Sequence, residues 1–182
     1  MIWRAFYLVL CGLFLAGIVH VAVILIIPEF GSKDAARQIV GSDDLLRFEL
    51  INDDTGIRVG DADPFFRTAV CRFDLSQNGV RIEGPKIAEF WSASVFDKRG
   101  RIVYSLNNRS AINNVLKMLV VSPIQMADIR ELQPEEIETS ILVEMPDERG
   151  FVILRTLVRD GSFESQARDF LNKVSCEPYV TR

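Results

Sequence analysis

The sequence predicts an α+β protein: an N-terminal transmembrane helix, then a β-rich domain with an antiparallel sheet and two or three short helices. Two observations lead to this fold class. One apolar run near the N-terminus is long enough to cross a bilayer, and no second run approaches that length. Beyond about residue 65, apolar and polar residues alternate in about seven segments, which is typical of half-buried strands that can fold over into a sandwich.

The apolar run covers residues 5–27, and only Gly12, Gly17 and His20 interrupt it. As a helix rising about 1.5 Å per residue it is about 34 Å long, which exceeds the ~30 Å of a hydrocarbon core. It is longer than the apolar core of a signal peptide, and no small-x-small cleavage pattern follows it. We therefore expect an uncleaved single-pass anchor over residues 1–28 that ends at Pro28.

The flanking residues predict the orientation of this anchor. Arg4 precedes the run, whereas Lys33 and Arg37 follow it, so the count of basic residues alone is balanced. A short head before the run and a long domain behind it favour export of the domain, and we expect the N-terminus in the cytoplasm. His20 is the only histidine, and with no second polar partner in the run we interpret it as a neutral side chain rather than a proton relay.

Residues 29–64 are predicted to be a linker with short helical pieces. Ser32 can cap a helix that ends at Val40, and residues 45–51 form a further short element. Two acidic turn clusters later in the linker lack the ligand spacing of an EF-hand loop, so we expect no metal site there.

The β-rich domain is expected over residues 65–182. Three pairs of consecutive alternating runs, each joined by a turn-forming sequence, predict hairpins. The pairs are residues 69–75 with 80–83, across Asn78-Gly79; residues 90–96 with 102–106; and residues 139–145 with 151–158.

The other elements of the domain are one central strand and two helices. Residues 115–121 are continuously apolar, which indicates a strand covered on both faces. Ser122 and Gln125 have the spacing of a capping box and open a helix to about Leu132. Ser162 is expected to cap a last helix with one apolar face. That face consists of Phe163, Ala167, Phe170, Leu171 and Val174.

The chain has three cysteines, of which Cys11 lies in the apolar run. The other two, Cys71 and Cys176, form an even pair, which in an oxidising compartment favours a disulfide. Such a bond closes a loop worth about 4–5 kcal/mol by chain-entropy arguments. The alternative is two separate buried thiols, which are common in cores.

Because the domain contains no histidine, it cannot form a Ser-His-Asp or Cys-His nucleophile or a histidine-containing zinc site. It has no phosphate-cradling or dinucleotide-binding glycine motif. The net charge of −4, without a basic stripe, argues against nucleic acid as a partner. We predict no catalytic residues, no metal and no cofactor.

The most distinctive stretch is the aromatic strand and the turn that follows its partner. Trp91, Tyr104, Asn107 and Arg109, together with Asp97, are candidate residues of a groove for a peptide or sugar. The alternative, which we favour, is a core of aromatic residues beside a polar corner in which Asp97 and Arg109 pair to fix the hairpin.

A series of motifs between residues 66 and 110 carries a resemblance to a known family. The motifs are Cys71-Arg72-Phe73-Asp74-Leu75-Ser76, Gly79-Val80-Arg81, Phe90-Trp91-Ser92, Val95-Phe96-Asp97, Gly100-Arg101 and Tyr104-Ser105-Leu106-Asn107-Asn108-Arg109. With them the chain resembles the DUF1254 family, and more closely its short single-span membrane proteins from alphaproteobacteria. The resemblance implies an inner-membrane protein with a β-rich domain in the envelope, and it transfers no catalytic residue.

From these observations we expect a membrane-anchored cell-envelope protein, single-pass in the inner membrane, with its C-terminal domain in the periplasm. Its domain would act as a non-enzymatic binding or assembly module for an envelope protein or a cell-wall ligand. The alternative is a histidine-free hydrolase or carbohydrate-active enzyme that uses paired carboxylates near Asp74, Asp97 and Arg109.

Overall fold

The computed structural model describes residues 2–40, 45–51, 63–87, 89–132 and 137–180. Contacts divide the chain into two compact units, residues 1–34 and residues 35–182. The first unit is helical, and the second contains all the strands.

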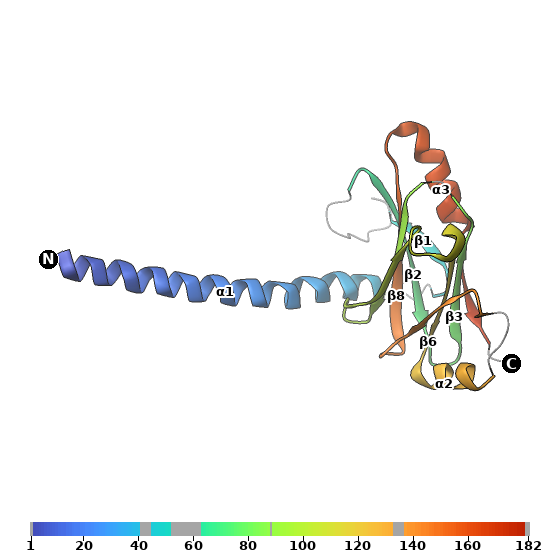
Figure 1. The fold of residues 1–182 in the computed structure, drawn as a ribbon, viewed down its shortest axis with the longest axis horizontal. Helices are drawn as coiled ribbons and strands as arrows, with labels where there is room; N and C mark the ends of the chain where they lie inside the picture. Colours follow the sequence, from blue (N-terminus) through green and yellow to red (C-terminus); the bar gives the residue numbers. More distant parts are fainter. Residues whose placement is uncertain (1, 41–44, 52–62, 88, 133–136, 181–182) are drawn as a thin grey trace. The chain divides into compact units, whose positions relative to one another are not determined.

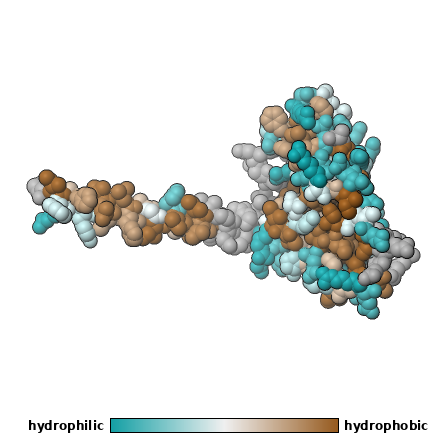
Figure 2. All heavy atoms as spheres, viewed as in Figure 1, coloured by the Kyte–Doolittle hydropathy of each residue, from teal (hydrophilic) through white to brown (hydrophobic). Residues whose placement is uncertain are grey.

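The N-terminal helix α1 covers Ile2–Val40 and is one continuous ribbon in Figure 1. Residues 2–26 of this helix are exposed, and an 18-residue window within them has a mean hydropathy of 2.8. Figure 2 shows the apolar side chains along the helix. This part is long and apolar enough to cross a membrane, as an anchor or as a signal sequence.

The prediction that Pro28 ends the helix is wrong, and so is that of a separate helix starting at Ser32. A proline inside a helix removes one backbone hydrogen bond and costs about 3 kcal/mol. The end of α1 offsets this cost, because Ala36 and Ile39 are buried in the second unit.

The second unit is built from two sheets. The first has the strand order β1-β2-β8-β4-β5 with all neighbours antiparallel, and the second has the order β7-β6-β3-β9 with β6 and β7 parallel. The strands are β1 (Phe48–Ile51), β2 (Phe66–Asp74), β3 (Gly79–Gly84), β4 (Trp91–Asp97), β5 (Ile102–Asn107), β6 (Leu116–Val121), β7 (Ile141–Glu144), β8 (Arg149–Leu157) and β9 (Ser175–Tyr179).

One core lies between the two sheets, so the predicted sandwich is confirmed. Alternate residues of β2, β4 and β8 face alternate residues of β3, β6 and β9 across it. The disulfide between Cys71 on β2 and Cys176 on β9 joins the two sheets, with the Cα atoms 6.6 Å apart. This confirms the predicted pair and indicates an oxidising compartment.

Helices cover both outer faces and one end of the sandwich. The end of α1 packs on the five-stranded sheet, and α2 (Pro123–Leu132) packs on the four-stranded sheet through Met126 and Ile129. The third helix, α3 (Glu164–Lys173), adds Phe170 and Leu171 to the central core. Figure 1 shows α2 and α3 toward opposite ends of the strands.

Of the three predicted hairpins, only β4–β5 is confirmed. The chain leaves the first sheet after β2, where the Leu75 N–H donates to the carbonyl of Glu148 and the Leu75 side chain enters the core. It then enters the second sheet as β3, which pairs with β6 and β9. Likewise β7 joins β6 in the second sheet while β8 lies between β2 and β4.

The remaining local predictions are confirmed with two corrections. The capping box forms, with Ser122 N–H 2.9 Å from Gln125 Oε1, and β6 is buried on both faces. Ser162 does not cap the last helix, which begins at Glu164 without a side-chain cap; Asp160 instead caps the 3-10 turn Gly161–Phe163 before it, accepting from the N–H of Ser162 at 2.8 Å. Strand β9 was not predicted, because its run contains Pro178 and little alternation.

Candidate functional site

The outer face of the five-stranded sheet has a covered half and an open half. Val70, Phe151 and Ile153 lie under Ala36 and Ile39 of α1. On the open half the outward residues are polar. The register places Ser92 beside Asn107 and Arg155, and Ser94 beside Ser105. We call this half the polar face, and it consists of Ser92, Ser94, Ser105, Asn107 and Arg155.

The polar face offers hydrogen bonds without a deep pocket. The hydroxyls of Ser94 and Ser105 lie 2.9 Å apart, and each still has capacity to donate or accept. Arg155 is exposed, and in the described part of the chain no carboxylate lies within ion-pair distance of it. A guanidinium beside hydroxyls suits an anionic or hydroxyl-rich ligand.

Two of the predicted groove residues are inside the protein. The Trp91 side chain is fully buried, with its ring centroid 6.4 Å from that of Phe170, and no acceptor among the described residues reaches its Nε1. Asp97 is 1% exposed at the end of the core. Neither side chain lines a groove.

The other three predicted residues lie on β5 and the turn after it, but Tyr104 and Asn107 point to opposite faces of the sheet, since they lie opposite Val95 and Ser92. Tyr104 is on the edge strand and is 37% exposed, and the side chain of Arg109 is exposed on the turn. Asn107 shapes this turn, because its Oδ1 accepts from the N–H groups of Arg109 at 2.9 Å and Ser110 at 3.2 Å. Binding of a ligand by these three residues stays a prediction.

The alternative in which Asp97 pairs with Arg109 is wrong. Asp97 accepts from Arg101 Nε at 2.6 Å and from the N–H groups of Arg99 and Arg101 at 2.9 Å. Burial favours the neutral carboxyl, but these hydrogen bonds outweigh it and lower the pKa of Asp97. The residue therefore stays charged and closes the β4–β5 turn.

The proposed carboxylate pair does not converge. Asp74 lies opposite Arg149 and Asp97 lies opposite Gly150, and since consecutive residues of β8 alternate, the two carboxylates point to opposite faces of the sheet. The Asp74 pKa is lowered by the hydrogen bond from Arg149, whereas a general acid needs a raised pKa. Among the described residues no group of three His, Cys, Asp or Glu could hold a metal ion.

The role of Arg72 has no signal in its own strand. The alternation of residues 69–75 predicts that Arg72 faces solvent, but it is 2% exposed, because the end of α1 covers it. Its Nε donates to the carbonyl of Ile39 near the end of α1, and its Nη1 lies 2.6 Å from Glu49 of β1. Arg72 thereby satisfies a helix carbonyl and joins α1, β1 and β2.

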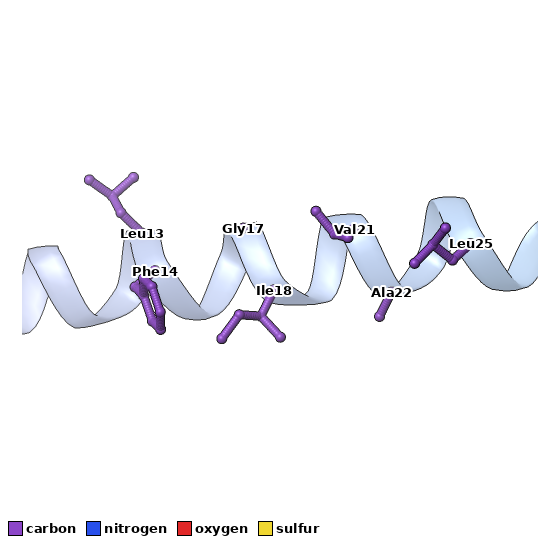
Figure 3. A pocket seen from close by; sticks show the side chains of 7 residues that line it. All are labelled: Leu13, Phe14, Gly17, Ile18, Val21, Ala22 and Leu25. Atoms are coloured by element: carbon purple, nitrogen blue, oxygen red, sulfur yellow. The ribbon is translucent and has the colours of Figure 1, made fainter.

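A hollow of about 630 Å³ lies along α1 and is drawn in Figure 3. Its lining residues form two i, i+4 rows of the helix, one of which contains Gly17, and none has a polar side chain. We interpret it as part of the apolar helix surface rather than a ligand site. The lining residues are Leu13, Phe14, Gly17, Ile18, Val21, Ala22 and Leu25.

Comparison with known proteins finds a family but no activity. The family described as "Protein of unknown function (DUF1254)" matches residues 67–178, and no curated protein matches the chain. The crystal structure of the VPA0106 protein from Vibrio parahaemolyticus is similar with a TM-score of 0.59 at 11% identity, over 82% of this chain and 35% of that one. An uncharacterised protein from Burkholderia cenocepacia has a TM-score of 0.49 at 13% identity, over 80% of this chain and 39% of that one.

The chain thus spans little more than a third of the length of either solved structure. At 11% identity, the likeness to the Vibrio protein shows the fold alone.

Proposed function

Since the chain belongs to the DUF1254 family, whose function is unknown, we propose a role from its own geometry. It is a membrane-anchored cell-envelope protein whose sandwich faces the periplasm and acts as a non-enzymatic binding module. In this proposal residues 1–28 hold the chain in the inner membrane with the N-terminus in the cytoplasm. The resemblance to short single-span alphaproteobacterial proteins supports the same placement.

The buried disulfide is the main support for the periplasmic location. Cys71 and Cys176 are 0% and 5% exposed and tie the two sheets together, so the bond belongs to the folded core. Such bonds form in the periplasm and are rare in the cytoplasm. An exported domain behind an uncleaved apolar helix requires the N-terminus to stay inside.

The polar face is the main support for the binding role. It is a continuous set of hydroxyl, amide and guanidinium groups on a rigid sheet, beside the edge strand that carries Tyr104. We propose that an envelope ligand or partner protein with hydroxyl or anionic groups binds there. Arg155 is the residue expected to contribute most, because charged donors form the stronger hydrogen bonds.

A topology experiment tests the location. A reporter enzyme that folds only in the periplasm, fused after Arg182, is expected to be active, and the intact mass of the purified chain is expected to include residues 1–28. A C-terminal fusion active only as a cytoplasmic reporter, or a chain shortened by the apolar run, would contradict the anchored periplasmic placement.

Site-specific photocrosslinking in living cells tests the binding role. A photoreactive residue in place of Ser94 on the polar face is expected to give a discrete adduct. The matched control replaces Asp128, an exposed residue of α2 on the opposite outer face, and is expected to give none. Arg155→Ala should abolish the Ser94 adduct while the thermal unfolding temperature is unchanged; equal adducts at both positions would refute the assignment.

A further inference from the structure

Strand β1 ends the five-stranded sheet on one side, since β2 is its neighbour in the strand order. In an antiparallel sheet the N–H and C=O of one residue point to the same neighbouring strand, and those of the next residue point to the strand on the other side. Val158 N–H donates to the carbonyl of Phe65 at 2.7 Å, in continuation of the β2–β8 ladder. The odd-numbered residues of β2 therefore bond to β8, and the even-numbered ones bond to β1.

The direction of the hydrogen bonds of β1 follows from this. Its residues Glu49 and Ile51 lie opposite the even-numbered residues of β2, so their backbone groups are used within the sheet. Phe48 and Leu50 consequently direct their N–H and C=O away from the sheet. Among the described residues no strand pairs with this side of β1, which we call the β1 edge.

The β1 edge borders a groove of about 290 Å³ between β1 and α3. Phe48 and Leu50 are half-buried there and pack against the central core, with Ala69 at the floor and Leu171 on the helix side. The groove therefore combines two outward donors and two outward acceptors with apolar side chains next to them. Its lining is Arg47, Phe48, Glu49, Leu50, Ala69, Leu171 and Asn172.

Among the described residues, the groove has one unpaired positive charge beside it. Glu49 is neutralised by the buried Arg72, at 2.6 Å. Arg47 is exposed, and no carboxylate in the described ranges lies within ion-pair distance of it. The groove therefore favours an occupant that carries a negative charge.

The β5 edge of the same sheet is not equivalent. A register shift interrupts its pairing with β4 between Val95 and Phe96, and such bulges protect edges. The backbone of Asn107 at its end is used by Ser110 and Ala111 of the following turn. Within the described part of this sheet, the β1 edge therefore combines two alternate outward backbone positions with a groove, which the β5 edge does not.

We propose that the β1 edge binds an extended segment of a partner protein, which adds a sixth strand to the sheet. Backbone hydrogen bonds to Phe48 and Leu50 hold the segment, an apolar side chain of the segment enters the groove against Leu171, and an acidic side chain lies beside Arg47. This surface is separate from the polar face, so either proposal can fail while the other stands.

Hydrogen exchange and peptide selection on the full chain in nanodiscs test the proposal. In the free protein the amides of Phe48 and Leu50 are expected to exchange faster than those of Glu49 and Ile51. A phage-displayed library of random peptides is expected to yield sequences that alternate apolar and polar residues and include an acidic one. Their binding should slow exchange at Phe48 and Leu50.

Variants at one position separate backbone from side chain. Leu50→Pro removes an N–H that no strand uses, so the fold should persist, but binding of the selected peptides should weaken about tenfold or more. Leu50→Ala keeps the N–H and should weaken binding by less than about threefold. Arg47→Gln should reduce binding of the acidic peptides and not of their amide versions.

The proposal is overturned if slow exchange in the free protein shows the edge already occupied, or if no peptide is enriched. It is equally overturned if the selected peptides bind Leu50→Pro as tightly as wild type. Should Leu50→Pro fail to fold, exchange at Phe48 and Leu50 of the wild-type chain with and without peptide still decides the outcome.

Discussion

Gly150 is the position where an added methyl group should harm the sandwich most clearly. It lies on β8 between Phe73 of β2 and Asp97 of β4. A Cβ atom there would be 2.4 Å from the carbonyl oxygen of Phe96, 2.8 Å from the Phe73 ring and 2.9 Å from the Met145 side chain. The carbonyl belongs to backbone held on both sides, so it cannot move away without breaking the sheet.

The expected cost follows from these contacts. Overpacking a core costs about 1–3 kcal/mol of stability. Because one of the three clashes is with backbone, we expect Gly150→Ala to lower the free energy of unfolding by about 3 kcal/mol. For a domain of this size that corresponds to a fall of about 6–12 °C in unfolding temperature. The measurement is denaturant and thermal unfolding of the full chain, followed by tryptophan fluorescence of the buried Trp91.

Gly161→Ala is the matched control, because a Cβ at Gly161 meets nothing within 4 Å. It should leave the unfolding temperature within about 2 °C of wild type, as expected of a surface substitution. A Gly150→Ala protein as stable as the control would show that β4, β8 and the β7–β8 connection are not packed as described, and would refute the reasoning.

Three further predictions concern stability. Arg72→Met should lower the free energy of unfolding, measured with denaturant, by about 2–3 kcal/mol, since it leaves Glu49 and a helix carbonyl without their partner. Arg149→Met removes an exposed ion pair and should have no measurable effect on that free energy. Replacing Cys71 and Cys176 together by Ala should lower the unfolding free energy by about 4–5 kcal/mol; the same loss on reducing the wild-type chain checks that the bond is its source. The pKa of Asp97 is lower in the folded state, so the stabilisation by its carboxylate is present above about pH 4 and is lost as the pH falls through the folded-state pKa. The unfolding free energy of Asp97→Asn, measured against pH, should therefore depend less on acid than that of wild type. An unchanged acid dependence would contradict the assignment.

The sequence predicted most elements but few of their neighbours. The runs that form β2, β3, β4, β5, β7 and β8 are recognisable by alternation, the run of β6 by its continuous apolar residues, and the capping box of Ser122 by its spacing. Two of the three predicted hairpins are wrong, because segments that follow one another in the chain lie in different sheets. At Leu75 the chain instead crosses the core, which lets both sheets bury their inner faces.

The candidate site shows the same division. Trp91 and Asp97 were candidates for a groove, yet both are buried, which for Trp91 agrees with the favoured interpretation of aromatic residues in the core. Arg72 was assigned to solvent by alternation, which was right about its face. The end of α1 covers that face, and no local pattern in β2 indicates a helix from another part of the chain.

Apolar length, alternation and cysteine count are local or compositional properties, so the sequence alone predicted the apolar helix, most of the strands with their inward residues, and Cys71 and Cys176 as the candidate disulfide pair. Strand order, the continuation of α1 past Pro28, the burial of Arg72 and the open β1 edge depend on which distant segments pack together. Only the tertiary structure decided these features, because backbone hydrogen bonds are alike for every strand and their partners are selected by packing of the whole core.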